Sequence, residues 1–492
     1  MKCRQAIYAF TRRCLTVGVS VGAINAVWVE AAHAGEWNIT PSASVTQNVT
    51  DNVRSVNTGK EADMITTATA GIEINGDGRR AQLDFSYDIS KDIFWDNSEL
   101  NGVRNSLLGA GVVELWEDHI FVDTRASITQ QTLSRTGGQT ASDRGAGTND
   151  QSVVVNYSIT PNFAHRYGNW AESDVIVAFS ETRFLESDTG TAETQPDASR
   201  SYDVTTLVRS GPRFSQLQWE INGNRTFTSD ETNRQTTELS GEYAVNRHVA
   251  VLARAGLEKI QNFTVKGDAS AQTFWRGGVR LTPGPRSSIR IETGRRFGAS
   301  IFSGDASYQI NSQTALTASY EEEVRTDRQS LTNNLNNVVR NASGVLINPA
   351  TGQPADPNSL DSDFQDRTTL QKDFAIALTG TSGRNTFALS GTSSIKEDNA
   401  ANSEDVVVGL TASLNRRIWP DLEGGVNGNV SSTIQSASGE EDVILNSGAF
   451  LTYTLGQDFS GTLRYDYLNR DSQGELNDVE ENAISLSLQK QF

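Results

Sequence analysis

From residue 35 onward, apolar and polar residues alternate with a period of two. In segment 82–90 (QLDFSYDIS) leucine, phenylalanine, tyrosine and isoleucine each stand between polar residues, and segments 463–467 (LRYDY) and 484–492 repeat the pattern. This period is typical of β-strands that place one face against an apolar medium. The i, i+3, i+4 spacing of amphipathic helices is missing from this part of the sequence. We therefore predict a single all-β domain over residues 35–492.

The connections between the predicted strands alternate between short and long. Short turns are expected near residues 75–79, 116–118, 245–247, 283–286 and 381–384. Long polar loops are expected near residues 47–62, 90–102, 131–149, 184–200, 225–234, 259–270, 325–368, 396–404, 433–441 and 469–481. Outer-membrane barrels show this asymmetry, with short periplasmic turns and longer extracellular loops. Counting hairpins predicts a transmembrane antiparallel up-and-down β-barrel of about 22 strands (20–22), with segment 295–315 poorly patterned.

A membrane barrel also explains where apolar and aromatic residues occur. Hydrocarbon offers no partner to a free backbone N–H or C=O, so strands can cross it only in a closed sheet. Each strand then needs apolar side chains on its outer face alone, which fits a chain that is only 36% hydrophobic. Trp116, Trp170 and Trp419 stand beside short turns and Trp95 beside a long loop, as interfacial aromatic girdles require.

The first 34 residues have the pattern of a signal peptide. Basic residues precede an apolar run at 15–29, which ends in the small-residue cleavage motif Ala32-His33-Ala34. The alternative is a retained anchor helix, but the run is short for a membrane span. Cys3 and Cys14 are the only cysteines, so the exported chain has none. We predict a signal peptide over residues 1–34 and export to the envelope of a Gram-negative bacterium.

The charge of the chain argues against nucleic acid as a partner. Its 492 residues include 42 Lys and Arg against 60 Asp and Glu, a net charge of -18. A nucleic-acid-binding protein normally carries the opposite excess. The longest uncharged apolar run is the N-terminal one, which excludes a helical membrane protein.

Four segments resemble a known family. GEWNITPSASVTQNVTDNV (35–53), DMITTATAGIEI (63–74), LDFSYDIS (83–90) and VVELWEDHIFVDTRASITQQ (112–131) are similar to the outer-membrane β-barrel proteins associated with PEP-CTERM/exosortase systems. Such barrels are usually encoded near exopolysaccharide biosynthesis genes. The resemblance implies exopolysaccharide and periplasmic secretion components as partners, and it offers no catalytic motif.

The last strand looks like a signal for barrel assembly. Ile484, Leu486, Leu488 and the terminal Phe492 lie on one face of it. An alternating last strand that ends in an aromatic residue looks like the signal read by the outer-membrane assembly machinery. Lys490 occupies a position on the same face where many such strands are apolar. We expect this machinery and the lipid of the outer membrane as partners.

Charged residues are predicted on the inner face of three consecutive strands. With the alternating apolar residues taken as outward, the lumen-lining candidates are Arg254, Glu258, Arg276, Arg280, Arg290 and Glu292. They could line a passage for a charged or hydroxyl-rich chain. The alternative, which we favour, is a ladder of ion pairs that braces the wall.

Whether the lumen is open is a separate question. Barrels of about 22 strands usually carry a plug, but the strand pattern here starts at Trp37, which disfavours a TonB-dependent transporter. Loop 325–368 is the longest and could close the lumen, although a solvated surface loop is the favoured alternative. Acidic clusters at 361–366 and 440–442 lack the spacing of a Ca²⁺ loop, so we predict no metal site and no cofactor.

We expect no enzymatic activity. The mature chain has three histidines, His119, His165 and His248, beside three different short turns, and no G-x-S-x-G, H-E-x-x-H or P-loop motif is present. The leading hypothesis is a transport or secretion component for exopolysaccharide. The alternatives are a general porin-like channel and a structural or surface-binding barrel that displays acidic extracellular loops.

Overall fold

The computed structural model describes most of the chain after residue 34. The described residues are 35–132, 139–142, 151–186, 196–229, 233–261, 272–340, 346–355, 364, 368–398, 402–436, 439, 441–473 and 478–492. The predicted signal peptide, residues 1–34, lies outside them, as do the acidic residues at 361, 363, 366 and 440.

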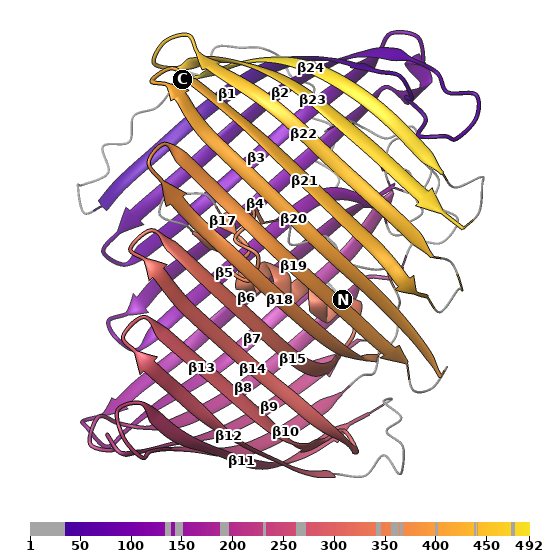
Figure 1. Ribbon diagram of the computed structural model, residues 1–492. Coiled ribbons are helices and arrows are strands. Elements are labelled where there is room, and N and C mark those ends of the chain that lie inside the picture. Colours follow the sequence, from indigo (N-terminus) through magenta and orange to yellow (C-terminus); the bar gives the residue numbers. More distant parts are fainter. Residues whose placement is uncertain are drawn as a thin grey trace, which may run out of the picture.

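Twenty-two antiparallel strands form one closed sheet (Figure 1). The first eleven are β1 (Gly35–Thr50), β2 (Asp63–Gly78), β3 (Ala81–Phe94), β4 (Gly102–Trp116), β5 (Ile120–Thr132), β6 (Gln151–Tyr167), β7 (Ala171–Glu186), β8 (Ser199–Ser210), β9 (Leu217–Thr228), β10 (Arg234–Ala244) and β11 (Val249–Ile260). The others are β12 (Gln272–Gly284), β13 (Ser287–Arg296), β14 (Ala299–Asn311), β15 (Thr314–Arg325), β18 (Thr369–Ser382), β19 (Asn385–Asp398), β20 (Ser403–Trp419), β21 (Leu422–Gln435), β22 (Asp442–Thr454), β23 (Phe459–Ser472) and β24 (Val479–Gln491). The predicted fold class and strand count are confirmed.

The barrel closes where the first strand meets the last. β1 pairs antiparallel with β24 from Ser42 opposite Gln491 to Thr50 opposite Ala483. The Thr46 hydroxyl donates a hydrogen bond to the Ser487 hydroxyl across this seam at 2.9 Å. The sheet therefore leaves no strand edge for lipid to meet, which is the condition for crossing hydrocarbon.

The poorly patterned segment 295–315 forms an ordinary hairpin with an unusually short turn. β13 and β14 are joined by Phe297 (φ 55°) and Gly298 (φ 73°), and positive φ at both central residues is typical of a type I′ turn. The turn lies at the end where the other loops are long. At the start of β14, Ile301 is buried and Phe302 is exposed, so two apolar neighbours break the alternation.

The outer surface is apolar and bordered by tryptophan. Trp116, Trp170 and Trp419 are all more than half exposed at the short-turn end, and Trp95 is exposed beside a long loop. Exposure of large apolar side chains on this scale costs free energy in water and none in lipid. The barrel has small apolar clusters near its long-loop end in place of one central core, such as Val53, Ile65, Phe94 and Leu100.

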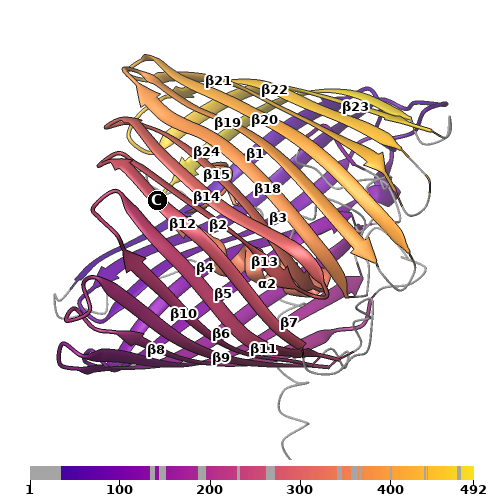
Figure 2. The same cartoon turned by 60° about the horizontal axis from the view of Figure 1, so that its bottom comes forward.

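The described part of loop 325–368 lies inside the barrel. It contains helix α2 (Asp327–Asn337) and the short strands β16 (Val339–Arg340) and β17 (Leu346–Ile347). Figures 1 and 2 show α2 within the ring of strands. For these residues the prediction of a solvated surface loop is wrong, because polar and apolar groups of the lumen wall hold them. Among the described residues, no helix is long and apolar enough to cross a membrane.

The terminal residue provides a test of the assembly signal. Phe492 is exposed, and its backbone N–H donates to the Pro41 carbonyl at 2.9 Å, so its ring contributes little to folded-state packing. We expect deletion of Phe492 to lower the amount of barrel in the outer membrane several-fold while leaving the unfolding temperature of refolded protein unchanged. Membrane fractionation and thermal unfolding measure the two effects.

Trp419→Ala is the matched control for this experiment, because it removes an exposed aromatic ring at the same end of the barrel. An equal loss of assembled barrel in both variants would show that Phe492 acts as one more girdle residue and carries no signal.

Candidate functional site

The six predicted lumen residues lie on one face of β11, β12 and β13. In β11, Val251 and Leu257 are exposed on the outer surface, whereas Leu252 and Glu258 are buried on the opposite face. The strand register brings Arg254 opposite Arg276, and Arg280 opposite Arg290. Like charges directly opposite each other are destabilising unless other groups compensate them.

Carboxylates of two neighbouring strands compensate Arg254 and Arg276, which we call the upper arginines because they lie nearer the long-loop end; Arg280 and Arg290 are the lower arginines. Arg254 makes ion pairs with Glu292 at 2.8 Å and with Glu238 at 3.2 Å. Arg276 reaches the second oxygen of Glu238 at 3.6 Å. Gly278, opposite Glu292, leaves room for that side chain: a Cβ at this glycine would lie 2.7 Å from the Glu292 Cγ. The charges of β10 to β13 thus form a ladder across the inner wall.

Glu242 of β10 joins the lower arginines in the same way. Its carboxylate pairs with Arg280, and its other oxygen lies 3.6 Å from Arg290. Arg290 is also 3.9 Å from Glu292, which links the lower part of the ladder to the upper part.

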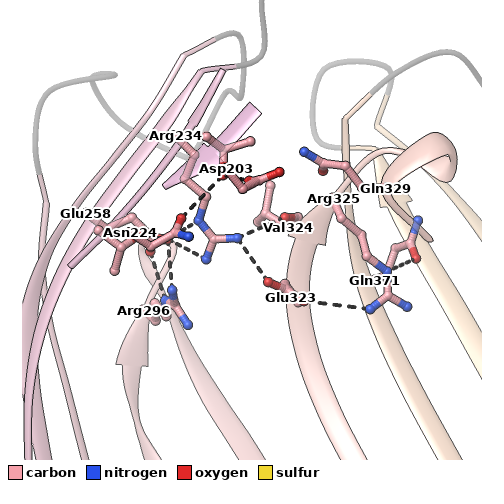
Figure 3. Close-up of polar contacts among 12 residues, drawn as sticks. Asp203, Asn224, Arg234, Glu258, Arg296, Glu323, Val324, Arg325, Gln329 and Gln371 are labelled. Carbon is pink, nitrogen blue, oxygen red and sulfur yellow. Dashed lines mark hydrogen bonds and ion pairs between the residues drawn. The ribbon is translucent and has the colours of Figure 1, made fainter. Parts of the chain in front are cut away.

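Glu258 is the most connected carboxylate of the ladder (Figure 3). It is almost completely buried and accepts from Arg234 at 2.7 Å and from Arg296 at 2.8 Å. Arg234 also pairs with Glu323 of β15 at 3.0 Å. The network therefore reaches from β10 to β15.

Several members of the ladder were not among the predicted residues. They are Arg234, Glu238, Glu242, Arg296 and Glu323. The sequence alone does not show that these side chains face the lumen, because an isolated charge in a strand can lie on either face. The pairing of β10 and β15 with their neighbours decides it.

The N-terminal end of α2 is fastened to β18 and β19. Thr326 caps the helix, accepting from the Gln329 N–H while the Gln329 side chain accepts from the Thr326 N–H. The first helical residue, Asp327, pairs with Lys396 at 2.6 Å, and both side chains are buried. Gln371 donates to Asp327 at 3.3 Å.

The C-terminal end of α2 is fastened to β5 and β6. Arg125 donates to the Val338 carbonyl at 2.8 Å and the Leu335 carbonyl at 3.3 Å, which satisfies carbonyls that a helix end leaves without partners. The Ser158 hydroxyl donates to Asn336 at 2.8 Å. Leu331 is buried in a cluster with Val154 and Phe184, and Phe364 packs against this cluster. An eleven-residue helix is about 16 Å long, and here it runs between opposed parts of the wall.

The segment after the helix contacts the wall at β18 and β20, on the side that holds the N-terminal end of α2. Gln353 accepts a hydrogen bond from the Ser413 hydroxyl of β20 at 3.3 Å. Gly352 has a φ of +69° and lies against β18, where a Cβ would approach the Thr379 methyl group to 2.3 Å. A glycine is therefore needed at residue 352 for both its backbone conformation and its close approach.

Two cavities in the lumen are lined mainly by hydroxyl and amide side chains. The first has a volume of about 460 Å³ and lies between α2 and the wall from β6 to β10. Its neutral polar lining includes Ser180, Thr182, Ser201, Thr205, Asn222, Asn224, Thr226, Thr332 and Asn333. The charged residues that border it are Asp203, Arg234, Glu238, Arg296, Glu323, Arg325 and Arg328. The second, of about 670 Å³, follows β1 to β5 with β23 and β24 and includes Ser44, Thr46, Asn48, Thr67, Thr69, Ser90, Asn105, Gln130 and Ser487.

Two of the three histidines lie together, although they stand beside different turns. The ring centroids of His119 and His165 are 5.5 Å apart, since β5 and β6 are neighbours. Trp116 stacks on His119, and Tyr167 meets His165 edge to face. The pair thus belongs to an aromatic cluster at the short-turn end. Within the described segments, no group of three or more His, Cys, Asp or Glu residues could hold a metal ion.

Comparison with known proteins identifies the fold. No protein-family model matches the chain, and no curated protein matches it in sequence. The siderophore receptor PirA from Acinetobacter baumannii shares 8% identity with a TM-score of 0.51, covering 92% of this chain and 80% of that chain. The ferric-catecholate import receptor Fiu from E. coli K12 shares 10% identity with a TM-score of 0.49, covering 94% and 82%.

The PirA likeness is one of fold alone. It agrees with the closed sheet and the apolar outer surface described above. A large closed barrel with an apolar outer surface belongs in the outer membrane of a Gram-negative cell.

Glu258 provides a test of the ladder. Glu258→Gln removes the charge that compensates two arginines in a water-poor part of the wall, so we expect it to lower the free energy of unfolding by about 3–5 kcal/mol. Urea unfolding of protein refolded into lipid vesicles measures the change.

Glu117→Gln is the matched control. Glu117 also contacts two arginines, Arg79 at 3.3 Å and Arg80 at 2.9 Å, but all three side chains are at least half exposed. We expect this change to cost less than about 1 kcal/mol. Equal losses for the two variants would contradict a bracing role for the buried pairs.

Proposed function

We propose that this barrel is a transport or secretion component that passes a hydroxyl-rich polymer, such as an exopolysaccharide, through the outer membrane. The observation that carries the proposal is the chemistry of the two lumen cavities, whose walls are built mainly from serine, threonine, asparagine and glutamine. Such side chains both donate and accept hydrogen bonds, so they can exchange partners with the hydroxyl groups of a moving sugar chain.

The pairing of the arginines supports a neutral cargo. Arg254, Arg276, Arg280 and Arg290 each lie within ion-pair distance of a glutamate. A site for a strongly anionic ligand needs cationic groups that the protein has not already neutralised. The ladder instead keeps the wall rigid beside the hydroxyl-lined space.

The position of α2 supports a gated passage over a general porin. The helix lies between two parts of the wall and is held at each end by a few side-chain contacts, including Asp327 with Lys396 and Arg125 with Val338. Because α2 crosses the lumen, we expect it to move, or to be moved by a partner, while a polymer passes. A barrel with a purely structural role has no need for hydroxyl-lined cavities beside such a helix.

The proposed physiological cargo is an exopolysaccharide. The N-terminal resemblance to PEP-CTERM/exosortase-associated barrels supports exopolysaccharide as the polymer and periplasmic secretion components as partners. Deleting the gene should lower extracellular polysaccharide while leaving the intracellular precursor pool intact or raised. An unchanged amount of extracellular polysaccharide in the deletion strain would contradict the proposed secretion role.

Replacing α2 and the segment after it should open the lumen. In a variant with residues 327–355 replaced by a short Gly-Ser linker, we expect single-channel conductance in planar bilayers to rise several-fold over the wild type. Soluble neutral polysaccharide added to one side should then reduce the current in the variant more than in the wild type.

Asn337→Ala is the control for this measurement, because Asn337 is an exposed residue of the same helix. It should leave the conductance at the wild-type value. If the replacement variant stays electrically silent although it is folded, α2 does not block the lumen and the structural role becomes the better reading.

A further inference from the structure

Five basic residues form an arc on the outer surface of the barrel near its long-loop end. The basic arc consists of Arg183 of β7, Arg200 of β8, Arg225 of β9, Lys259 of β11 and Arg295 of β13. These strands are neighbours or next neighbours in the sheet. The arc therefore covers one continuous part of the circumference.

The side chains of the basic arc face lipid, and the ladder faces the lumen. Lys259 has the same parity as the exposed Val251 and Leu257 in β11, whereas Glu258 between them is buried. Arg225 shares its face with the exposed Ile221 and Phe227 of β9. The same alternation places Arg183, Arg200 and Arg295 outward, each near the long-loop end of an outward-facing apolar row. The arc thus lies at the upper border of the apolar band.

Among the described residues, the arc carries more positive charge than the nearby carboxylates neutralise. Arg183 and Arg200 share one buried carboxylate, Glu181. Arg225 lies over the Phe227 ring, and no described residue makes an ion pair with Arg225, Lys259 or Arg295. Arg225 and Lys259 are both register partners of Gln235, so only one strand separates them. Two strand spacings are about 10 Å, a separation at which one multiply charged head group can meet both cations.

The rest of the same rim, beginning two strands from Arg295, has a different charge pattern. Outward positions at the long-loop ends of β15, β19, β20 and β24 carry Glu322, Glu397, Glu404 and Glu480. Lys372 pairs with Glu397, and Lys60 pairs with Glu480 at 3.2 Å. The positive surplus is therefore local to β7–β13 and does not follow from the general composition of the rim.

We propose that the basic arc binds the phosphate groups of an anionic, phosphorylated lipid in the outer leaflet. Long loops lie on the extracellular side of outer-membrane barrels, so this rim is at the level of the outer-leaflet head groups. Uncompensated cations at that level attract anionic head groups, and arginine binds phosphate through parallel N–H donors. The acyl chains of the lipid lie against the apolar rows directly below. The arc fixes which side of the barrel carries the lipid, independently of what passes through the lumen.

The test uses lipid A with both phosphates and the same lipid with both phosphates removed. Native mass spectrometry of the folded, detergent-solubilised barrel measures the bound fraction against lipid concentration. We expect wild-type protein to bind the phosphorylated lipid about tenfold or more tightly than the phosphate-free lipid. The variant Arg225→Gln/Lys259→Gln/Arg295→Gln should bind both forms as weakly as wild type binds the phosphate-free form. Inorganic phosphate at the same concentration should not compete.

The control variant is Arg79→Gln/Arg286→Gln/Arg384→Gln, which removes the same charge from exposed positions at the short-turn end. It should retain wild-type affinity. Heat-dependent mobility in detergent gels confirms that each variant is folded, and Lys259→Gln alone provides a milder test, with a smaller loss expected. Equal affinity of the wild type for the two lipids, or wild-type affinity in the basic-arc variant, would overturn the proposal.

Discussion

The backbone hydrogen bonds of the sheet are the constraint on which the rest of this structure depends. In hydrocarbon, each unpaired N–H or C=O costs several kcal/mol, so the strands have to close on themselves. The pairing of β1 with β24 meets this requirement. Closure in turn separates two surfaces with different solvents, and the alternation of side chains along each strand follows from that separation.

The inner surface shows what closure permits. Charged groups such as Glu258, Arg234 and Arg296 are shielded from lipid by the sheet, and their mutual contacts take the place of water. Ion pairs in such a place add little net stability compared with apolar packing, but losing one partner is costly. The ladder is therefore best understood as a set of mutual constraints on the wall. The two cavities beside it are lined mainly by hydroxyl and amide groups, with charged residues among them.

Sequence reasoning succeeded where the period of two is regular and failed where distant contacts decide. The strand count and the inward parity of Arg254 and Glu292 follow from alternation alone. Helix α2 has only Leu331 and Leu335 as apolar residues in an asparagine-rich segment, and the capping box of Thr326 and Gln329 is its main local signal. It is held by contacts with Arg125 and Ser158, about two hundred residues earlier in the chain. Likewise, the neighbouring positions of His119 and His165 follow from the β5–β6 register, which only the three-dimensional pairing supplies.

The distance in sequence between α2 and its anchoring residues also bears on how the chain acquires its structure. β5 and β6 precede α2 in the sequence, whereas Lys396 lies on β19, which follows the helix. The helix can meet both only after the two halves of the sheet have curved towards each other. Contacts of such long range form late, because the chain must first bring remote segments together. Docking of α2 is therefore expected to be among the final events of maturation, so we expect a chain halted during insertion to lack this helix across its lumen.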